Sequence, residues 1–182
     1  MDEKRRRFEA QAIPHLDAAM NLARWLTRSH ADADDIVQEA MLRAFRAFDG
    51  FRGGDVKPWL LAIVRNCFVT SVKQTRRRGH VALVDDSAPA NDDAPLTANE
   101  PDPEAAAIGS DAGQKLANVI AQLPEEFRTV LILRELEDMS YREIADVTGL
   151  PMGTVMSRLA RARALLKDTW TTQVERSSGH GM

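Results

Sequence analysis

The sequence of 182 residues contains a single cysteine, Cys67, so no disulfide can form within the chain, as is typical of proteins from a reducing cytoplasm. No stretch approaches the roughly 20 apolar residues that span a bilayer. The first ten residues, MDEKRRRFEA, lack the apolar segment of a signal peptide. We therefore expect a cytoplasmic protein that does not insert into a membrane by itself.

Residues that commonly carry catalysis or bind metals are scarce. The four histidines are scattered along the chain: His15, His30, His80 and His180. Cys67 lies on an apolar helix face, where a core position is favoured over a nucleophile or a metal ligand. No glycine-rich phosphate-binding signature occurs. We expect no catalytic residue, metal or cofactor, and hence no enzyme.

The sequence also lacks strand patterns and internal repeats, which predicts an all-α fold. The net charge of −3 conceals an asymmetry between segments. Residues 1–78 contain fifteen Lys and Arg against ten Asp and Glu, residues 79–113 none against eight, and residues 114–182 nine against nine. This pattern predicts two small helical domains, 1–79 and 114–182, joined by a flexible acidic linker, 80–113.

The stretch Ser140 to Lys167 predicts a helix-turn-helix. Ser140 and Glu143 have the spacing of a capping box, which places the start of the first helix. Gly149 allows the sharp turn, and Pro151 is suited to open the second helix because a proline lacks the N–H that would be unpaired there.

The second of these helices has two distinct faces at 100° per residue. The first is apolar and predicted to be buried: Val155, Leu159, Ala162 and Leu166. The second is suited to a DNA major groove, since Arg binds guanine edges bidentately and Thr or Ser binds bases or phosphates: Thr154, Ser157, Arg158 and Arg161. The alternative to a DNA-binding motif is a pair of helices that is simply exposed to solvent. This alternative is disfavoured because the capping box, the glycine, the proline and the arginine face all agree with a helix-turn-helix.

The first domain is predicted to contain helices over 14–28, 33–48 with Asp32 as cap, and 57–78. Residues 49–56, DGFRGGDV, contain three glycines and are predicted to form a loop. Further helices are predicted from 114 and from 125, and the polar tail, 171–182, is expected to fray.

Two segments resemble a known family. LPEEFRTVLILRELEDMSYREIADVTGLPMGTVMSRLARAR resembles the C-terminal domain of bacterial RNA polymerase sigma factors of the extracytoplasmic-function class. DADDIVQEAMLRAFRAFDGFRGG followed by WLLAIVRN resembles their N-terminal domain. The resemblance implies a factor that binds core RNA polymerase, directs it to promoter DNA at −35 and −10 elements, and is controlled by an anti-sigma factor.

The resemblance also implies a role for one face of the helix predicted over residues 33–48. Asp35, Gln38 and Glu39 match the family's Asp-x-x-Gln-Glu pattern, which docks on the clamp of the largest polymerase subunit. Without the resemblance, a solvated helix face would be favoured. Residues 125–137 would seat against the flap of the second-largest subunit, and the acidic linker would enter the polymerase channels.

The loop 49–56 resembles the family's loop that captures a flipped base of the −10 element. The residues implied to contact DNA in this region are Phe51, Arg52, Asn66, Lys73, Arg76 and Arg77. Three alternatives stay open: Phe51 anchors the loop in the core, Asn66 caps a local turn, and the basic cluster complements the dipole of its helix.

The resemblance implies that Thr154, Ser157, Arg158 and Arg161 read the −35 element as a duplex. Two positions depart from the family. Met156 stands where relatives often have Lys or Arg, and either packs or contacts a thymine methyl. Thr70 stands where relatives often have an acid, so no network is carried over there.

Two other functions are compatible with a helix-turn-helix. One is a self-sufficient repressor or activator that binds a palindrome as a dimer, but residues 1–78 resemble neither a ligand pocket nor a dimerisation coil. The other is a decoy that binds an anti-sigma partner and never DNA, which would not require the arginine face.

Overall fold

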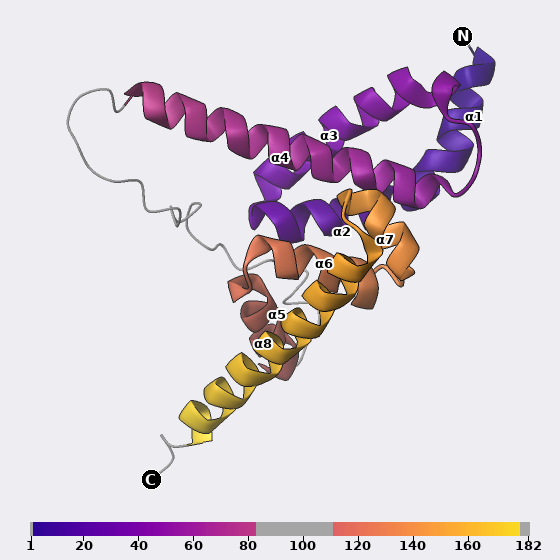
Figure 1. The fold of residues 1–182 in the computed structure, drawn as a ribbon. Coiled ribbons are helices and arrows are strands. Elements are labelled where there is room, and N and C mark those ends of the chain that lie inside the picture. The colour runs from indigo at the N-terminus through magenta and orange to yellow at the C-terminus, as the bar shows by residue number, and fades with distance from the viewer. Residues whose placement is uncertain (1, 83–110, 179–182) are drawn as a thin grey trace.

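The computed structural model describes residues 2–82 and 111–178, and every regular element within these ranges is a helix (Figure 1). The first group comprises α1 (Asp2–Ala12), η1 (Ile13–His15), α2 (Leu16–Thr27), α3 (His30–Ala47), η2 (Phe48–Gly50) and α4 (Val56–Ala82). The second comprises α5 (Asp111–Gln122), α6 (Glu125–Glu135), α7 (Tyr141–Thr148) and α8 (Met152–Ser178). The prediction of an all-α fold is confirmed, while most of the predicted linker lies outside the described residues.

The start of α3 differs from the prediction. Ser29, and not Asp32, is the N-cap: the backbone N–H of Asp32 donates to the Ser29 hydroxyl at 3.3 Å. The chain enters this cap through Arg28, which has a left-handed backbone with φ of 60° and ends α2. Asp32 therefore lies in the first turn, where its charge complements the helix dipole.

Three predicted helix ends were placed wrongly. Pro14 lies inside the 3-10 turn η1, so the α-helical part of 14–28 begins only at Leu16. α4 continues to Ala82 because one glycine, Gly79, weakens a helix without ending it. α8 continues to Ser178, and the tail predicted to fray is helical to that point, since no proline interrupts it.

The helix-turn-helix forms from the local signals named above. The N–H of Ser140 donates to the Glu143 carboxylate at 2.7 Å, and the N–H of Glu143 donates to the Ser140 hydroxyl at 3.2 Å. Gly149 ends α7 with φ of 71°. Pro151 precedes α8 and accepts hydrogen bonds from the N–H groups of Thr154 and Val155, so it occupies the cap position and not the first helical position.

We expect Ser140→Ala to lower the free energy of unfolding by about 1 kcal/mol, because the N–H of Glu143 loses its acceptor. Urea denaturation followed by circular dichroism measures this change. Ser71→Ala, on an exposed part of α4, is the matched control and should not destabilise the protein. Equal stability of the two variants would show that the capping box contributes nothing.

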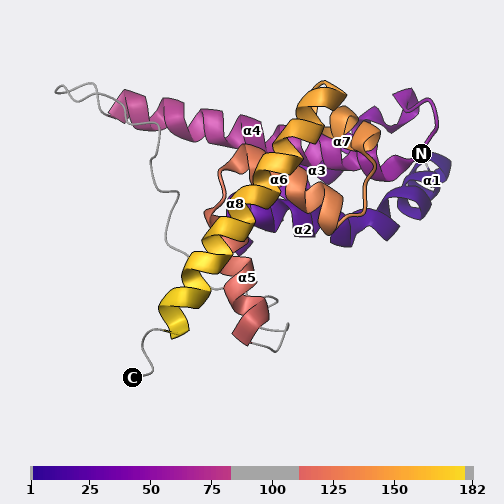
Figure 2. The same cartoon turned by 60° about the horizontal axis from the view of Figure 1, so that its bottom comes forward.

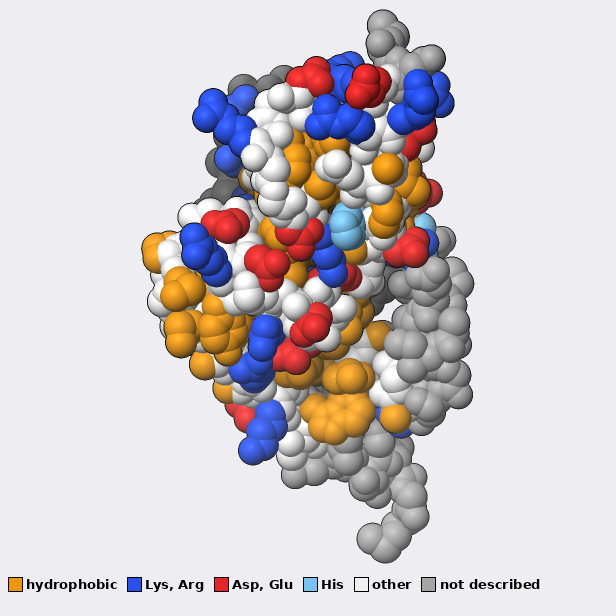
Figure 3. All heavy atoms as spheres, turned by 90° about the vertical axis from the view of Figure 1, so that its right-hand side faces the viewer, with side chains coloured by type: hydrophobic (Ala, Val, Ile, Leu, Met, Phe, Trp, Pro, Cys, Tyr) orange, Lys and Arg blue, Asp and Glu red, His pale blue; other side chains and the backbone are white. Residues whose placement is uncertain are grey.

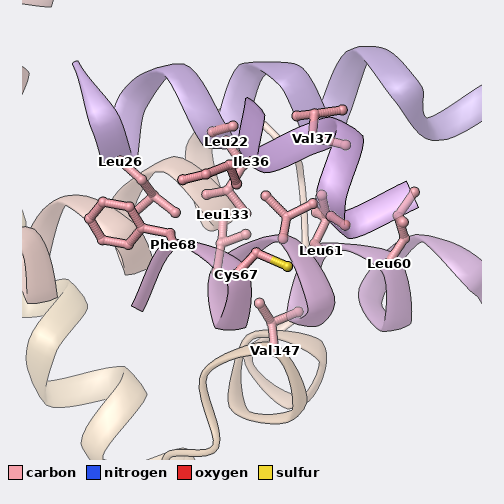
Figure 4. Close-up of a cluster of buried hydrophobic side chains, with 14 of the residues drawn as sticks. Leu22, Leu26, Ile36, Val37, Leu60, Leu61, Cys67, Phe68, Leu133 and Val147 are labelled. Carbon is pink, nitrogen blue, oxygen red and sulfur yellow. The ribbon is translucent and has the colours of Figure 1, made fainter. Parts of the chain in front are cut away.

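One hydrophobic core extends through both groups of helices. α2, α3 and α4 pack together, and α6 and α7 pack onto α2 and α4, an arrangement that we call the domain contact (Figure 2). Figure 4 shows Val147 of α7 pointing toward Cys67 and Leu61 of α4, while Leu133 of α6 lies beside Leu22 of α2. Cys67 is buried, as predicted.

The domain contact also contains a buried polar cluster around Glu137, which is 8% exposed. Its carboxylate accepts a hydrogen bond from the Asn21 amide at 2.7 Å and pairs with the Lys57 ammonium at 3.1 Å. Lys57 also donates to the Glu137 backbone carbonyl at 2.8 Å. Because Asn21 and Lys57 come from α2 and α4, the cluster holds the two groups of helices in one orientation.

Candidate nucleic-acid interface

The two faces predicted for α8 are present, except that Leu166, which was predicted to be buried, is only partly buried. Val155, Leu159 and Ala162 are at most 1% exposed. On the other side, Ser157 and Arg161 are exposed, while Thr154 and Arg158 are half-buried. The α8 helix begins beside α7 and then runs away from the first group of helices, as both ribbon views show (Figures 1 and 2). Most of its outward side is thereby accessible.

Two of the four predicted reading residues use their side chains in contacts within the chain. A guanidinium nitrogen of Arg158 lies 3.1 Å from the Glu126 carboxylate of α6, and the Ser157 hydroxyl donates to the Thr154 carbonyl at 3.0 Å. Ion pairs of such exposure contribute about 0–1 kcal/mol, so Arg158 can leave Glu126 at little cost. The sequence carries no signal for this pair, because its members are far apart in the chain.

Arg163 behaves differently from the reading residues. Its guanidinium donates to the Glu135 carboxylate at 2.7 and 3.1 Å, which raises the pKa of Arg163. The ion pair therefore ties Arg163 to α6 within the second group of helices.

The residues predicted to bind near the −10 element do not form one cluster. Arg52 lies in the loop before α4, whereas Lys73, Arg76 and Arg77 lie in its last turns, and all four are exposed. Lys73 lies seventeen positions after Val56 in the helix, which corresponds to about 26 Å. Asn66 is exposed between them, and its carbonyl accepts a hydrogen bond from the Thr70 hydroxyl at 2.8 Å. These predicted DNA-binding residues are therefore spread from the loop before α4 to the last turns of that helix.

Phe51 anchors the glycine-rich loop. Its ring centroid lies 4.9 Å from that of Trp59 and 6.3 Å from that of Phe48, within an aromatic cluster that packs on the core. Beyond this anchor the chain turns through Gly53 and Gly54, with φ of 90° and 102°, values that suit glycine.

A pocket of about 440 Å³ lies between this loop and the N-terminal helices. Phe51 forms part of its wall, and its polar lining includes Arg7, Gln11, His15 and Asp55. Sequence reasoning missed the residues from α1 and η1, because nothing in the pattern of an N-terminal helix indicates that it borders a loop forty residues later.

The predicted polymerase-docking residues lie on the outer side of α3. Asp35 and Gln38 are exposed, and Glu39 is half-exposed and accepts a hydrogen bond from Arg43 at 2.6 Å. Gln38 also borders an apolar groove of about 870 Å³ that α1, η1, α2 and α3 form together. Sequence reasoning did not find the groove, because no single helix contains it.

The face on the right of Figure 1 mixes acidic and basic side chains, with separate hydrophobic patches between them (Figure 3). Within the described ranges, no group of three or more His, Cys, Asp or Glu residues could hold a metal ion. Nor does any helix in the part of the chain that the structure covers have the length and apolarity needed to cross a membrane.

Comparison with known proteins assigns both groups of helices. Residues 13–78 match the family described as Sigma-70 region 2, and residues 113–166 match the family described as Sigma-70, region 4. The ECF RNA polymerase sigma-E factor of Escherichia coli (strain K12) is 37% identical over 134 residues, which cover 72% of this chain and 70% of that protein. The chain belongs to the extracytoplasmic-function sigma factors of the sigma-70 family. Members of this family direct transcription initiation and are not enzymes.

A second relative of this sigma factor is ECF RNA polymerase sigma factor SigE of Mycolicibacterium smegmatis, 35% identical over 154 residues. The alignment covers 85% of this chain and 58% of that longer protein. Among solved structures, the sigma factor RpoE of Bartonella quintana in complex with the anti-sigma factor NepR superimposes with a TM-score of 0.67 at 27% identity. It covers 90% of this chain and 96% of the other, so both groups of helices correspond.

Proposed function

We propose that this sigma factor binds core RNA polymerase in the bacterial cytoplasm and directs it to promoters with −35 and −10 elements. The observation that carries the proposal is the pairing of an outward arginine face on α8 with a separate loop-and-helix surface along α4. Run-off transcription of a genomic library by core polymerase, with and without the protein, tests it. A dimeric repressor and a decoy would both fail to stimulate initiation.

For the −35 element, the proposal places the N-terminal half of α8 in the major groove. Arg158 and Arg161 are suited to guanine edges, because a guanidinium donates two parallel hydrogen bonds to O6 and N7. Thr154 and Ser157 complete the surface with contacts to bases or phosphates. To bind DNA, Arg158 must leave the Glu126 carboxylate. The new contact with DNA is also charge-assisted, so it replaces the one that is lost.

For the −10 element, the proposal places a flipped base in the pocket beside the glycine-rich loop. A pocket of about 440 Å³ is large enough for a base, and Arg7, Gln11 and His15 carry groups that can hydrogen-bond to its edge. Phe51 contributes an aromatic wall while it anchors the loop. Arg52, Asn66, Lys73, Arg76 and Arg77 then bind the backbone of the adjoining DNA along α4.

The domain contact limits what the closed molecule can do. At about 3.4 Å per base pair, elements centred about 25 base pairs apart are separated by roughly 85 Å. A compact chain of this size has a radius of gyration of about 16 Å. By covalent geometry, a segment with the length of residues 83–110 can span at most roughly 100 Å, so separating the two groups of helices permits binding to both elements.

We propose that an anti-sigma factor holds the closed arrangement and that polymerase selects the open one. The similarity to the RpoE–NepR complex supports the first part. The packing of α6 on α2 supports the second part, because a helix that also docks on the flap of the second-largest subunit would have to expose the side that α2 covers.

We expect Asp35→Ala combined with Gln38→Ala to weaken core polymerase binding by about tenfold or more, through loss of a contact with the clamp of the largest subunit. Both side chains are exposed, so the fold should persist. Asp17→Ala, an exposed acid on α2, is the control. Unchanged affinity of the double variant for core polymerase, measured by fluorescence anisotropy, would refute the docking face.

A further inference from the structure

Two methionines on α8 are strongly exposed: Met152 is 52% and Met156 is 49% accessible. They are four residues apart and therefore share one strip of the helix surface. At 100° per residue, this strip lies on one side of Ser157, whereas Arg161 lies on the other. Met156 therefore does not pack into the core, which removes one of the two alternatives for this position.

Both methionines lie in the first turns of α8. In a helix-turn-helix this is the part of the reading helix that contacts base edges. Exposed apolar residues are common on protein surfaces, so exposure by itself indicates no ligand. Here, however, Met156 lies about 100° from Ser157 around the helix, and the two positions between them, Gly153 and Ala160, carry no side chain longer than a methyl group. The methionines would reach the groove together with Ser157.

The chemistry of methionine restricts what it can recognise there. A thioether donates no hydrogen bond and accepts only weakly, so it cannot distinguish donors from acceptors on a base edge. The apolar group that the major groove displays is the C5-methyl of thymine. Methionine is also flexible and polarisable, and can cover a methyl group with little distortion of the helix.

We propose that Met152 and Met156 select thymine in the −35 element by covering its C5-methyl group. This inference rests on the proposed function, because it requires α8 to bind promoter DNA. Contact with an anti-sigma factor is a different use of the same strip and predicts no response to the thymine methyl.

The test replaces thymine by deoxyuridine, which lacks the methyl group and keeps every hydrogen-bonding atom of the base. The probe is the promoter that the holoenzyme uses best in the genomic run-off experiment, with each −35 thymine replaced in turn. At one or more positions the wild-type holoenzyme should bind about fourfold more weakly, as expected for one buried methyl group. Met156→Ala or Met152→Ala should bind the original promoter more weakly and lose that response to deoxyuridine.

Leu116→Ala on α5, where the side chain is 40% exposed, is the matched control and should retain the full response. The inference is overturned if no deoxyuridine weakens binding by the wild type, or if both methionine variants respond as the wild type does. In either case, a holoenzyme that still binds and uses the promoter leaves the proposed function intact. A holoenzyme that binds no promoter refutes both.

Discussion

Replacing Glu137 by alanine should weaken the domain contact by about 2–3 kcal/mol and shift the free sigma factor toward an open arrangement. The Glu137 side chain is 7% exposed and that of Lys57 is 25% exposed, so the replacement leaves a largely buried ammonium without its carboxylate. The Asn21 amide loses its acceptor as well. Lys57 keeps its bond to the backbone carbonyl of residue 137, so the variant isolates the contribution of the carboxylate.

A second feature of the same contact favours opening. Arg128 of α6 is 5% exposed, and burial together with the nearby charge of Arg28 from α2 lowers its pKa to about 10. Its guanidinium remains charged at neutral pH and donates to the carbonyls of Ala121 and Leu123 at the end of α5. The charge of Arg28 is close enough to lower the pKa of Arg128, so repulsion between these two residues opposes the closed arrangement.

Small-angle scattering of the free protein measures the first prediction directly, since the radius of gyration rises when the two groups of helices separate. Glu135→Ala is the control, because Glu135 is an exposed acid that pairs with Arg163 inside the second group. We also expect Glu137→Ala to bind core polymerase more tightly, because less free energy is needed to expose α6. A scattering profile identical to that of the wild type, with unchanged polymerase affinity, would show that the Glu137 cluster does not hold the contact.

Local signals made most of the fold predictable. The capping box at Ser140, the left-handed Gly149 and the apolar spacing of Val155 and Leu159 each act within a few residues, so the sequence contains all the information that they need. The start of α3 shows the limit of this approach. Ser29 and Asp32 are both good caps, and only the turn made by Arg28 decides between them.

Contacts between distant segments could not be predicted in the same way. Val147 and Leu133 are apolar in the sequence, but the sequence carries no information about which helix covers each of them. The pairing of Asn21 with Glu137 spans 116 positions, and the pocket beside Phe51 combines segments from α1, η1 and the loop. The separation of Arg52 from Lys73 follows only once α4 is known to be straight and continuous.

Replacing Arg161 by alanine should weaken binding of a −35 duplex by about 1–3 kcal/mol, that is, about 5- to 150-fold. Arg161 is exposed and stands on the outward side of α8, so its replacement should remove the proposed DNA contact and leave the core intact. Arg158→Ala should have an effect in the same range. Arg5→Ala, which removes an equal charge from α1, is the control and should change the affinity of this duplex little.

The ion pair between Arg158 and Glu126 allows a test of whether Arg158 contacts DNA directly. The alternative is that Glu126 affects DNA binding only through its own negative charge. Glu126→Gln releases Arg158 from its partner, so it should raise duplex affinity up to about fivefold in the wild type. The same replacement should have a smaller effect in the Arg158→Ala variant, in which no guanidinium is left to release. Equal gains in both backgrounds would show that Glu126 acts through its charge on DNA alone. If neither arginine variant weakened binding, α8 would not be the reading helix.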